Sequence, residues 1–169
     1  MLVPAIAYSA ELNKKFNLMR YSDEAICFNG CIEFGGLQIS DEPSEGKFQY
    51  AILDKGEVVG YMGYYVDFYC SGMWGIGLVS FDDKPNRAIA SAVLHILKKI
   101  QEYNLHRVEF RAIEGNHANF NYENFIKLAN KSGEFYAREI KLLDTFKDRQ
   151  GNYRDSYIYE FIRRSDNEG

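Results

Sequence analysis

The stretch that decides the fold is residues 73–113, MWGIGLVSFDDKPNRAIASAVLHILKKIQEYNLHRVEFRAI. Its first part, Met73–Phe81, is short, apolar and preceded by the turn signal Ser71-Gly72, which predicts a strand. Its last part, His106–Ile113, alternates apolar and charged side chains and predicts a second strand. A helical pattern separates the two strands, so we expect a βαβ crossover with a parallel strand pair at about residues 73–113.

The helical pattern of the crossover begins after a loop, Asp82–Asn86, in which Pro85 is typical of a helix start. Asn104 ends it. The expected buried face, at helical spacing, consists of Ala88, Ile89, Ala92, Val93, Ile96, Leu97 and Ile100. Outside that face we expect His95, Lys98, Lys99 and Glu102.

A meander of strands is predicted just before the crossover. Phe48–Leu53 is apolar and aromatic, Asp54–Glu57 is a turn signal with Gly56 available for positive φ, and Val58–Cys70 is a long strand pattern. Two consecutive hairpins indicate an antiparallel sheet.

After the crossover, the loop Glu114–Asn116 leads into a helix predicted over Phe120–Ala129. Two final strands are predicted over Phe135–Thr145 and Tyr153–Arg163. The fold class is therefore α+β, with a mixed, mostly antiparallel sheet flanked by helices.

The N-terminal part, residues 1–45, is predicted to be helical, and residues 46–163 form the sheet-rich part of a single domain over 1–169. Ser9 is the expected N-cap of a helix that carries Leu12, Phe16 and Met19 at helical spacing. A second short helix is expected near Ser22.

Composition narrows the class of protein. A net charge of −4 argues against a nucleic-acid partner, which usually needs a basic surface. No apolar run is long enough to cross a membrane, and we expect a cytoplasmic protein without a membrane partner. Cys27, Cys31 and Cys70 are expected to be buried, reduced thiols, and the three histidines are scattered, so no metal site is expected.

Several local sequences, in this order, resemble the GNAT superfamily of acyl-CoA-dependent N-acyltransferases. The similar segments span about residues 45–163 and are Gln49–Tyr61, Gly75–Phe81, Lys84–Tyr103, Leu105–Ile113, Gly115-Asn116, Tyr122–Phe125 and Gly151–Glu160. No single motif among them is specific, and the ordered set carries the resemblance. It implies a GNAT-like fold and acetyl-CoA as co-substrate.

The resemblance also implies where the co-substrate binds. Its diphosphate would lie at the start of the crossover helix, on Arg87, Ala88, Ile89 and Ala90, where a helix N-terminus attracts anions. Pro85 and Ala88 depart from the usual family pattern, so an ordinary amphipathic helix is the alternative interpretation. The acyl arm would pair with the backbone of Leu78, Val79 and Ser80, and Asn116 would contact the arm.

The same resemblance suggests Tyr122 as the general acid that protonates the leaving sulfur. The base is less defined, because Met73–Phe81 contains no acidic residue. Asp67 lies at two-residue spacing from Tyr65 and Tyr69, with Tyr61 on the same predicted face, and is a candidate acceptor-site residue. Glu109 is a second candidate with a more ordinary role as a paired surface charge. A water relay without a side-chain base is a third possibility.

The function expected from the resemblance is an acetyl-CoA-dependent N-acetyltransferase that acts on a small amine or a peptide amine. The alternative is a non-catalytic GNAT-fold module that binds or regulates through a degenerate acyl-CoA loop. An acyl group other than acetyl also stays open, and a homodimer is possible. The chain has neither a Gly-x-Ser-x-Gly elbow nor a phosphate-binding P-loop motif.

Overall fold

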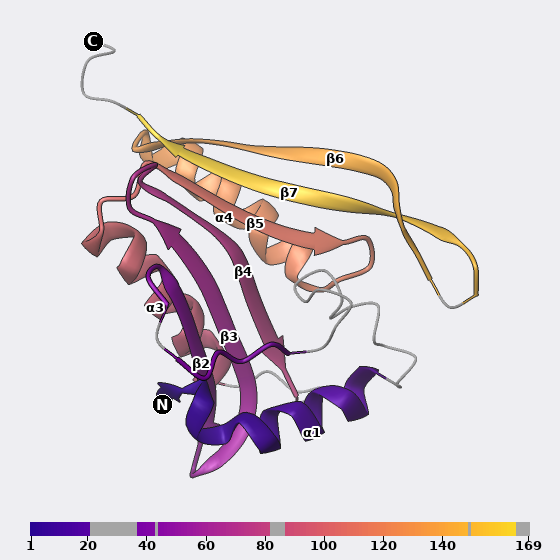
Figure 1. The fold of residues 1–169 in the computed structure, drawn as a ribbon. Helices are drawn as coiled ribbons and strands as arrows, with labels where there is room; N and C mark the ends of the chain where they lie inside the picture. The colour runs from indigo at the N-terminus through magenta and orange to yellow at the C-terminus, as the bar shows by residue number, and fades with distance from the viewer. Residues whose placement is uncertain (21–36, 43, 82–86, 149, 165–169) are drawn as a thin grey trace.

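The computed structural model describes residues 1–20, 37–42, 44–81, 87–148 and 150–164. These residues form one seven-stranded sheet in the order β1-β2-β3-β4-β5-β7-β6, flanked by helices (Figure 1). The strands are β1 (Leu2–Pro4), β2 (Lys47–Asp54), β3 (Glu57–Asp67), β4 (Gly72–Ser80), β5 (Arg107–Ile113), β6 (Phe135–Lys147) and β7 (Tyr153–Arg163). The helices are the 3₁₀ helix η1 (Ala5–Tyr8), α1 (Ser9–Arg20), α3 (Arg87–Glu102) and α4 (Ala118–Ser132).

The predicted α+β class and the crossover are confirmed. β4 and β5 pair in parallel and are joined through α3, whereas the other pairings of this sheet are antiparallel. The strand predicted over His106–Ile113 is β5, which begins one residue later, and the strand predicted over Tyr153–Arg163 is β7 with the same ends. The helix α4 is longer than expected and ends at Gly133, whose φ of 77° suits a left-handed cap that glycine adopts without strain.

The core lies on both faces of the sheet. One face is covered by α3 and α4, which contribute Ile96 and Tyr122 to a cluster with Met62 and Phe110 of the strands. The opposite face of β2–β4 is covered by α1, whose Leu12 and Phe16 pack with Ala51 and Tyr61. Figure 1 shows α1 on one side of β2–β4, with α3 on the other side.

The helical prediction for the N-terminal part was wrong at its start. Leu2–Pro4 forms β1, an edge strand beside β2, because the amine of Met1 donates to the carbonyl of Leu53 and the N–H of Leu53 returns a bond to Met1. Since η1 runs directly into α1, Ser9 continues a helical backbone and is not an N-cap. The short helix expected near Ser22 lies outside the described residues.

The buried stripe of α3 is rotated relative to the prediction. Ala92, Ile96 and Ile100 are buried as expected, but Leu97 is exposed. His95 was expected on the outer face, yet its ring lies edge-on to Tyr50 at 5.5 Å. Aromatic rings of β2 and β3 lie beside this side of the helix. The His95 ring packs against them, a contact that the helical spacing of the sequence does not predict.

Candidate functional site

The parallel pair β4–β5 is joined only at one end. Gly72 is in register with Arg107 and Met73 with Val108, after which no further register pair is formed although β4 continues to Ser80. Figure 1 shows the two strands diverging beyond this point, each in the direction of its own carboxyl end. The divergence leaves one edge of β4 without a neighbouring strand over most of its length, within the described part of the chain.

A β-bulge lies where the divergence begins. The register between β3 and β4 shifts after Gly63, and Gly75 sits in the shifted segment with a φ of 60°. That conformation is open to glycine and strained for most other residues, so the sequence fixes the bulge at this position. The bulge follows Met73, the last residue of β4 that pairs with β5, by two residues.

The backbone of Leu78 faces the open edge of β4. Phe81 donates its N–H to Val59 of β3, and the carbonyl of Val79 points at Gly60 of the same strand. Because backbone groups alternate in direction along an extended strand, Leu78 and Ser80 point the opposite way, toward β5. Leu78, Val79 and Ser80 were predicted to bind an acyl arm through their backbones. The backbone groups of Val79 instead point toward β3.

The first turn of α3 begins near the open end of β4. Arg87 and Ala90 are exposed, while Ala88 and Ile89 pack partly against the core. The turn contains no acidic residue, which suits an anion at the positive end of the helix dipole. The loop 82–86, with Pro85, lies outside the described residues, so the diphosphate site predicted there is described only from Arg87 onward.

Tyr122 lies on α4 and is buried against β5. Its ring centroid is 5.0 Å from that of Phe110 and 5.2 Å from that of Tyr159. The Tyr159 hydroxyl donates to Asn119 at 3.0 Å, and burial raises the pKa of Tyr159 above its usual value. The structure thus brings Tyr122 beside the strand that forms one wall of the divergence.

Asn116 caps the start of α4. Its Oδ1 accepts a hydrogen bond from the N–H of Ala118 at 2.9 Å. Such a bond satisfies one of the free N–H groups at a helix start. This structural task accounts for the asparagine at this position, and the predicted contact with an acyl arm remains a prediction.

Asp67 lies at the closed end of the strand pair. It is in register with Gly72, and its Oδ1 accepts hydrogen bonds from the N–H groups of Tyr69 and Cys70 at 2.9 and 3.0 Å. These bonds hold the turn between β3 and β4. Tyr69 belongs to that turn and is 98% exposed, so the prediction that it shares a strand face with Asp67 was wrong.

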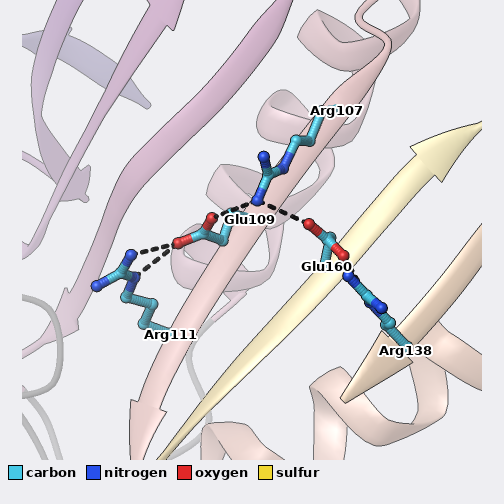
Figure 2. A network of polar contacts seen from close by, with 5 residues as sticks. All are labelled: Arg107, Glu109, Arg111, Arg138 and Glu160. Carbon is cyan, nitrogen blue, oxygen red and sulfur yellow. Dashed lines mark hydrogen bonds and ion pairs between the residues drawn. The ribbon is translucent and has the colours of Figure 1, made fainter. Parts of the chain in front are cut away.

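Glu109 follows Val108, the last residue of β5 that pairs with β4, and lies on the face of the sheet opposite α4. Its carboxylate bonds Arg111 at 2.6 Å and Arg107 at 3.5 Å. Arg107 also bonds Glu160 of β7 at 2.7 Å, and Glu160 in turn bonds Arg138 of β6 (Figure 2). Glu109 is thus part of a row of ion pairs across three strands. This agrees with its expected role as a paired surface charge.

A pocket of about 190 Å³ opens beside the bulge, on the α1 side of the sheet. We call it the tyrosine pocket; its walls and floor include Lys47, Gln49, Tyr61, Tyr65, Gly75 and Gly77. Of these residues, Tyr61 and Tyr65 were predicted from the sequence to share a strand face, whereas Lys47 and Gln49 were not predicted to belong to a site. The two-residue period of the strand could have indicated them. Lys47 and Gln49 alternate with Phe48 and Tyr50, which pack toward α3, so the two polar side chains lie on the opposite face.

Other classes of site find no support in the described residues. They contain no group of three or more metal-binding side chains. None of their helices has the length and apolarity needed to cross a membrane. Cys70 is exposed, contrary to the expectation that it would be buried, because it lies in the turn between β3 and β4.

Comparison with solved structures identifies the fold. A probable GNAT-family acetyltransferase from Chromobacterium violaceum matches 96% of this chain and 85% of its own, at 18% identity and a TM-score of 0.58. The ribosomal-protein-S18-alanine N-acetyltransferase from Escherichia coli matches 97% and 92%, at 11% identity and 0.58. The microcin C7 self-immunity acetyltransferase MccE, solved with acetyl-CoA and AMP, matches 95% and 91%, at 19% identity and 0.59.

Some matches are shorter: one further acetyltransferase aligns over 59% of its own length. No protein-family model matches the sequence, and no curated protein matches it. At identities this low, the likeness establishes a shared fold and leaves the activity to be argued from the site.

Proposed function

We propose that this chain, which has the fold of the GNAT acetyltransferases, is an acetyl-CoA-dependent N-acetyltransferase that acts on an amine. The observation that carries the proposal is the divergence of β4 from β5 after Met73 and Val108. It leaves the backbone of Leu78 directed at an edge without a neighbouring strand, where an extended amide-containing arm is able to bind as a strand would.

The described residues fit acetyl-CoA in two respects. The amide-rich arm of the molecule needs backbone donors and acceptors, which Leu78 directs toward it. Its phosphates need positive charge and the positive end of a helix dipole, for which we propose Arg87 and the first turn of α3, where Ile89 and Ala90 follow. When bound, acetyl-CoA supplies the activated acetyl group as a thioester.

Within this proposal, Tyr122 donates a proton to the leaving sulfur, since acyl transfer to an amine needs an acid for the thiolate. Its position against Phe110 of β5 supports this role. The base is assigned to no single residue: Glu109 is held between two arginines and Asp67 holds a turn, so a water relay is the simplest route for the amine proton.

The proposal is tested by ligand stabilisation and turnover. Acetyl-CoA at about 100 times its dissociation constant adds about 2.7 kcal/mol of stability, which raises the melting temperature of a chain of this size by roughly 5–10 °C. Release of the CoA thiol in the presence of an amine panel measures turnover.

The matched variants for this test are Arg87→Ala and Lys98→Ala, which remove one positive charge each from opposite parts of the same helix. We expect Arg87→Ala to weaken acetyl-CoA binding about threefold to tenfold, as loss of one charge-assisted contact does, and Lys98→Ala to leave it unchanged. No stabilisation by millimolar acetyl-CoA and no turnover would refute the transferase and favour a non-catalytic binding module.

A further inference from the structure

The tyrosine pocket is placed and sized for one small group. It borders Gly75 and Gly77, in the stretch of β4 that also leads to the open backbone edge at Leu78. Its volume is about 190 Å³. The pocket therefore accepts a small metabolite or a single residue of a peptide, not a folded surface.

The hydroxyl of Tyr61 is held as a hydrogen-bond donor within the pocket wall. The Gln49 side-chain amide donates both to this hydroxyl and to the Gln38 carbonyl, each at 2.8 Å, while its oxygen accepts from the Ser40 N–H at 3.0 Å. Gln49 is thereby fixed, and Tyr61 retains its own proton for another acceptor. Burial raises the pKa of Tyr61, although the bond from Gln49 opposes this, so the hydroxyl stays protonated at neutral pH.

Lys47 adds a positive charge on the same face. It is in register with Tyr65 and shares the orientation of Gln49, two residues further along β2. Its side chain is exposed, and within the described part of the chain it forms no ion pair. Together, Lys47 and Tyr61 offer a cation and an O–H donor to whatever enters the pocket.

The pocket is flat on the side of the sheet. A Cβ atom at Gly63 would lie 2.4 Å from the Tyr61 hydroxyl, which shows that the Tyr61 ring lies down along the strand over this glycine. Tyr65 leans against Trp74 with ring centroids 5.7 Å apart. The pocket is thus lined by peptide backbone and by the faces of aromatic rings. Such a lining favours a planar or aromatic ligand.

We infer that the acceptor of this site is a primary amine that also carries a carboxylate or phosphate group on a small, flat or aromatic body. The anionic group binds Lys47 and the Tyr61 hydroxyl, and the body lies over Gly75 and Gly77 between the tyrosines. A polyamine fits poorly, because its positive charges would lie beside Lys47. This inference rests on the proposed function for the catalytic step, but the binding it describes does not need that step.

The reaction this acceptor would undergo is balanced without a further reactant. A bond forms between the amine nitrogen and the acetyl carbon, and the bond between that carbon and sulfur breaks. The amine releases a proton to water and the sulfur gains one, so the products are an N-acetyl amide and a free thiol. The anionic group of the acceptor takes no part and serves only to position the nitrogen.

Phenylalanine and phenethylamine are the decisive pair of probes, since they differ only in the carboxylate. We expect the wild-type chain with acetyl-CoA to prefer phenylalanine over phenethylamine, and to prefer both over spermidine, measured as kcat/KM from thiol release. Lys47→Gln should lower the ratio of phenylalanine to phenethylamine about threefold to tenfold, the value of one charge-assisted contact. Lys55→Gln, in the exposed turn after β2, should leave the ratio unchanged.

A second measurement separates this inference from the proposed function. Binding of phenylalanine and phenethylamine is measured by calorimetry without acetyl-CoA, for the wild type, Lys47→Gln and Tyr61→Phe. Tighter binding of phenylalanine that is lost in both variants supports the pocket even if no acetyl group is transferred. Equal or better use of phenethylamine or spermidine, or an unchanged ratio in Lys47→Gln, overturns the inference while leaving the transferase in place.

Discussion

The side-chain amide of Asn130 in α4 bonds both backbone groups of Ala137 in β6. Its Nδ2 donates to the Ala137 carbonyl at 2.8 Å, and the Ala137 N–H donates to its Oδ1 at 2.9 Å. β6 is the last strand of the sheet, and its outer edge would otherwise be open to another strand. The amide therefore occupies one position of this edge as a neighbouring strand would, and it ties α4 to the sheet.

Asn130→Ala removes both bonds and tests this tie. We expect the free energy of unfolding, measured by urea denaturation, to fall by about 1–3 kcal/mol, because each of these two part-buried hydrogen bonds contributes about 0.5–1.5 kcal/mol. Lys127→Ala, one turn earlier on α4, is the control and should change stability by less than about 0.5 kcal/mol. Equal effects of the two variants would show that the amide contributes nothing specific.

Gly60 permits the close approach of α3 and β4 to β3. A Cβ atom at this position would lie 2.5 Å from the carbonyl oxygen of Val79 and 2.6 Å from Ile89. Because the carbonyl belongs to a paired strand, Gly60→Ala should destabilise the chain by roughly 1–3 kcal/mol. Gly56→Ala is the comparison: its Cβ has free space and only its φ of 88° is unfavourable, so it should cost about 1 kcal/mol. A smaller loss for Gly60→Ala than for Gly56→Ala would contradict the close contact.

The central part of the fold is predictable from the sequence because its signals are local. Alternation in His106–Ile113 predicts β5, and the helical period before it predicts the crossover helix. β1 has no such signal, because three residues are too few for a period. Its strand conformation depends on pairing between Met1 and Leu53, which are distant in the sequence.

The candidate site was predictable only in outline. The resemblance to the GNAT superfamily implies that β4 and β5 diverge, but no local pattern in the sequence shows that their pairing ends after Met73 and Val108. Lys47 was not predicted because the strand was identified from its apolar and aromatic residues, Phe48–Leu53. The contact of the half-buried His95 with the rings of β2 and β3 likewise depends on how α3 packs on the sheet.

Asp148 makes the stability of the β6–β7 hairpin depend on acid pH. Burial alone would raise the pKa of its carboxyl, but hydrogen bonds from the backbone and side chain of Asn152 and from Arg154 outweigh this and lower the pKa below its ordinary value of 3.8. A carboxyl with a lowered pKa in the folded state stabilises above its unfolded pKa, and that contribution is lost as the pH falls through the folded pKa.

Asp148→Asn should therefore be less stable than the wild type by a constant amount between about pH 5 and 8, and the difference should shrink below about pH 4. Urea denaturation at several pH values measures this. Asp54→Asn, at an exposed position beside the β2–β3 turn, is the matched control. A difference for Asp148→Asn that stays the same down to pH 3 would mean that the carboxylate charge has no part in holding the turn.

Two substitutions at Asp67 distinguish a structural role of its side chain from a role in the acceptor site. Asp67→Asn keeps an oxygen that can accept the N–H bonds of Tyr69 and Cys70, whereas Asp67→Ala loses both. We expect Asp67→Ala to lower the free energy of unfolding by about 1 kcal/mol and Asp67→Asn to stay within about 0.5 kcal/mol of the wild type.

The activity of Asp67→Asn decides the catalytic prediction. If the carboxylate serves the acceptor, kcat/KM for the amine should fall at least tenfold at unchanged melting temperature, because only its charge is removed. A value within about twofold of the wild type would limit Asp67 to the turn.

Tyr122 and Tyr159 are neighbouring phenols with different expected roles, and they provide the final test. Tyr122→Phe keeps the ring contacts with Phe110 and removes only the hydroxyl, so the proposed acid should be lost without loss of the fold. We expect kcat to fall about 100-fold while KM for acetyl-CoA stays within about twofold. Tyr159→Phe loses the bond to Asn119 and should cost about 1 kcal/mol of stability, with kcat within about threefold of the wild type. Unchanged kcat in Tyr122→Phe would remove this tyrosine from the proton path and assign the protonation of sulfur to water.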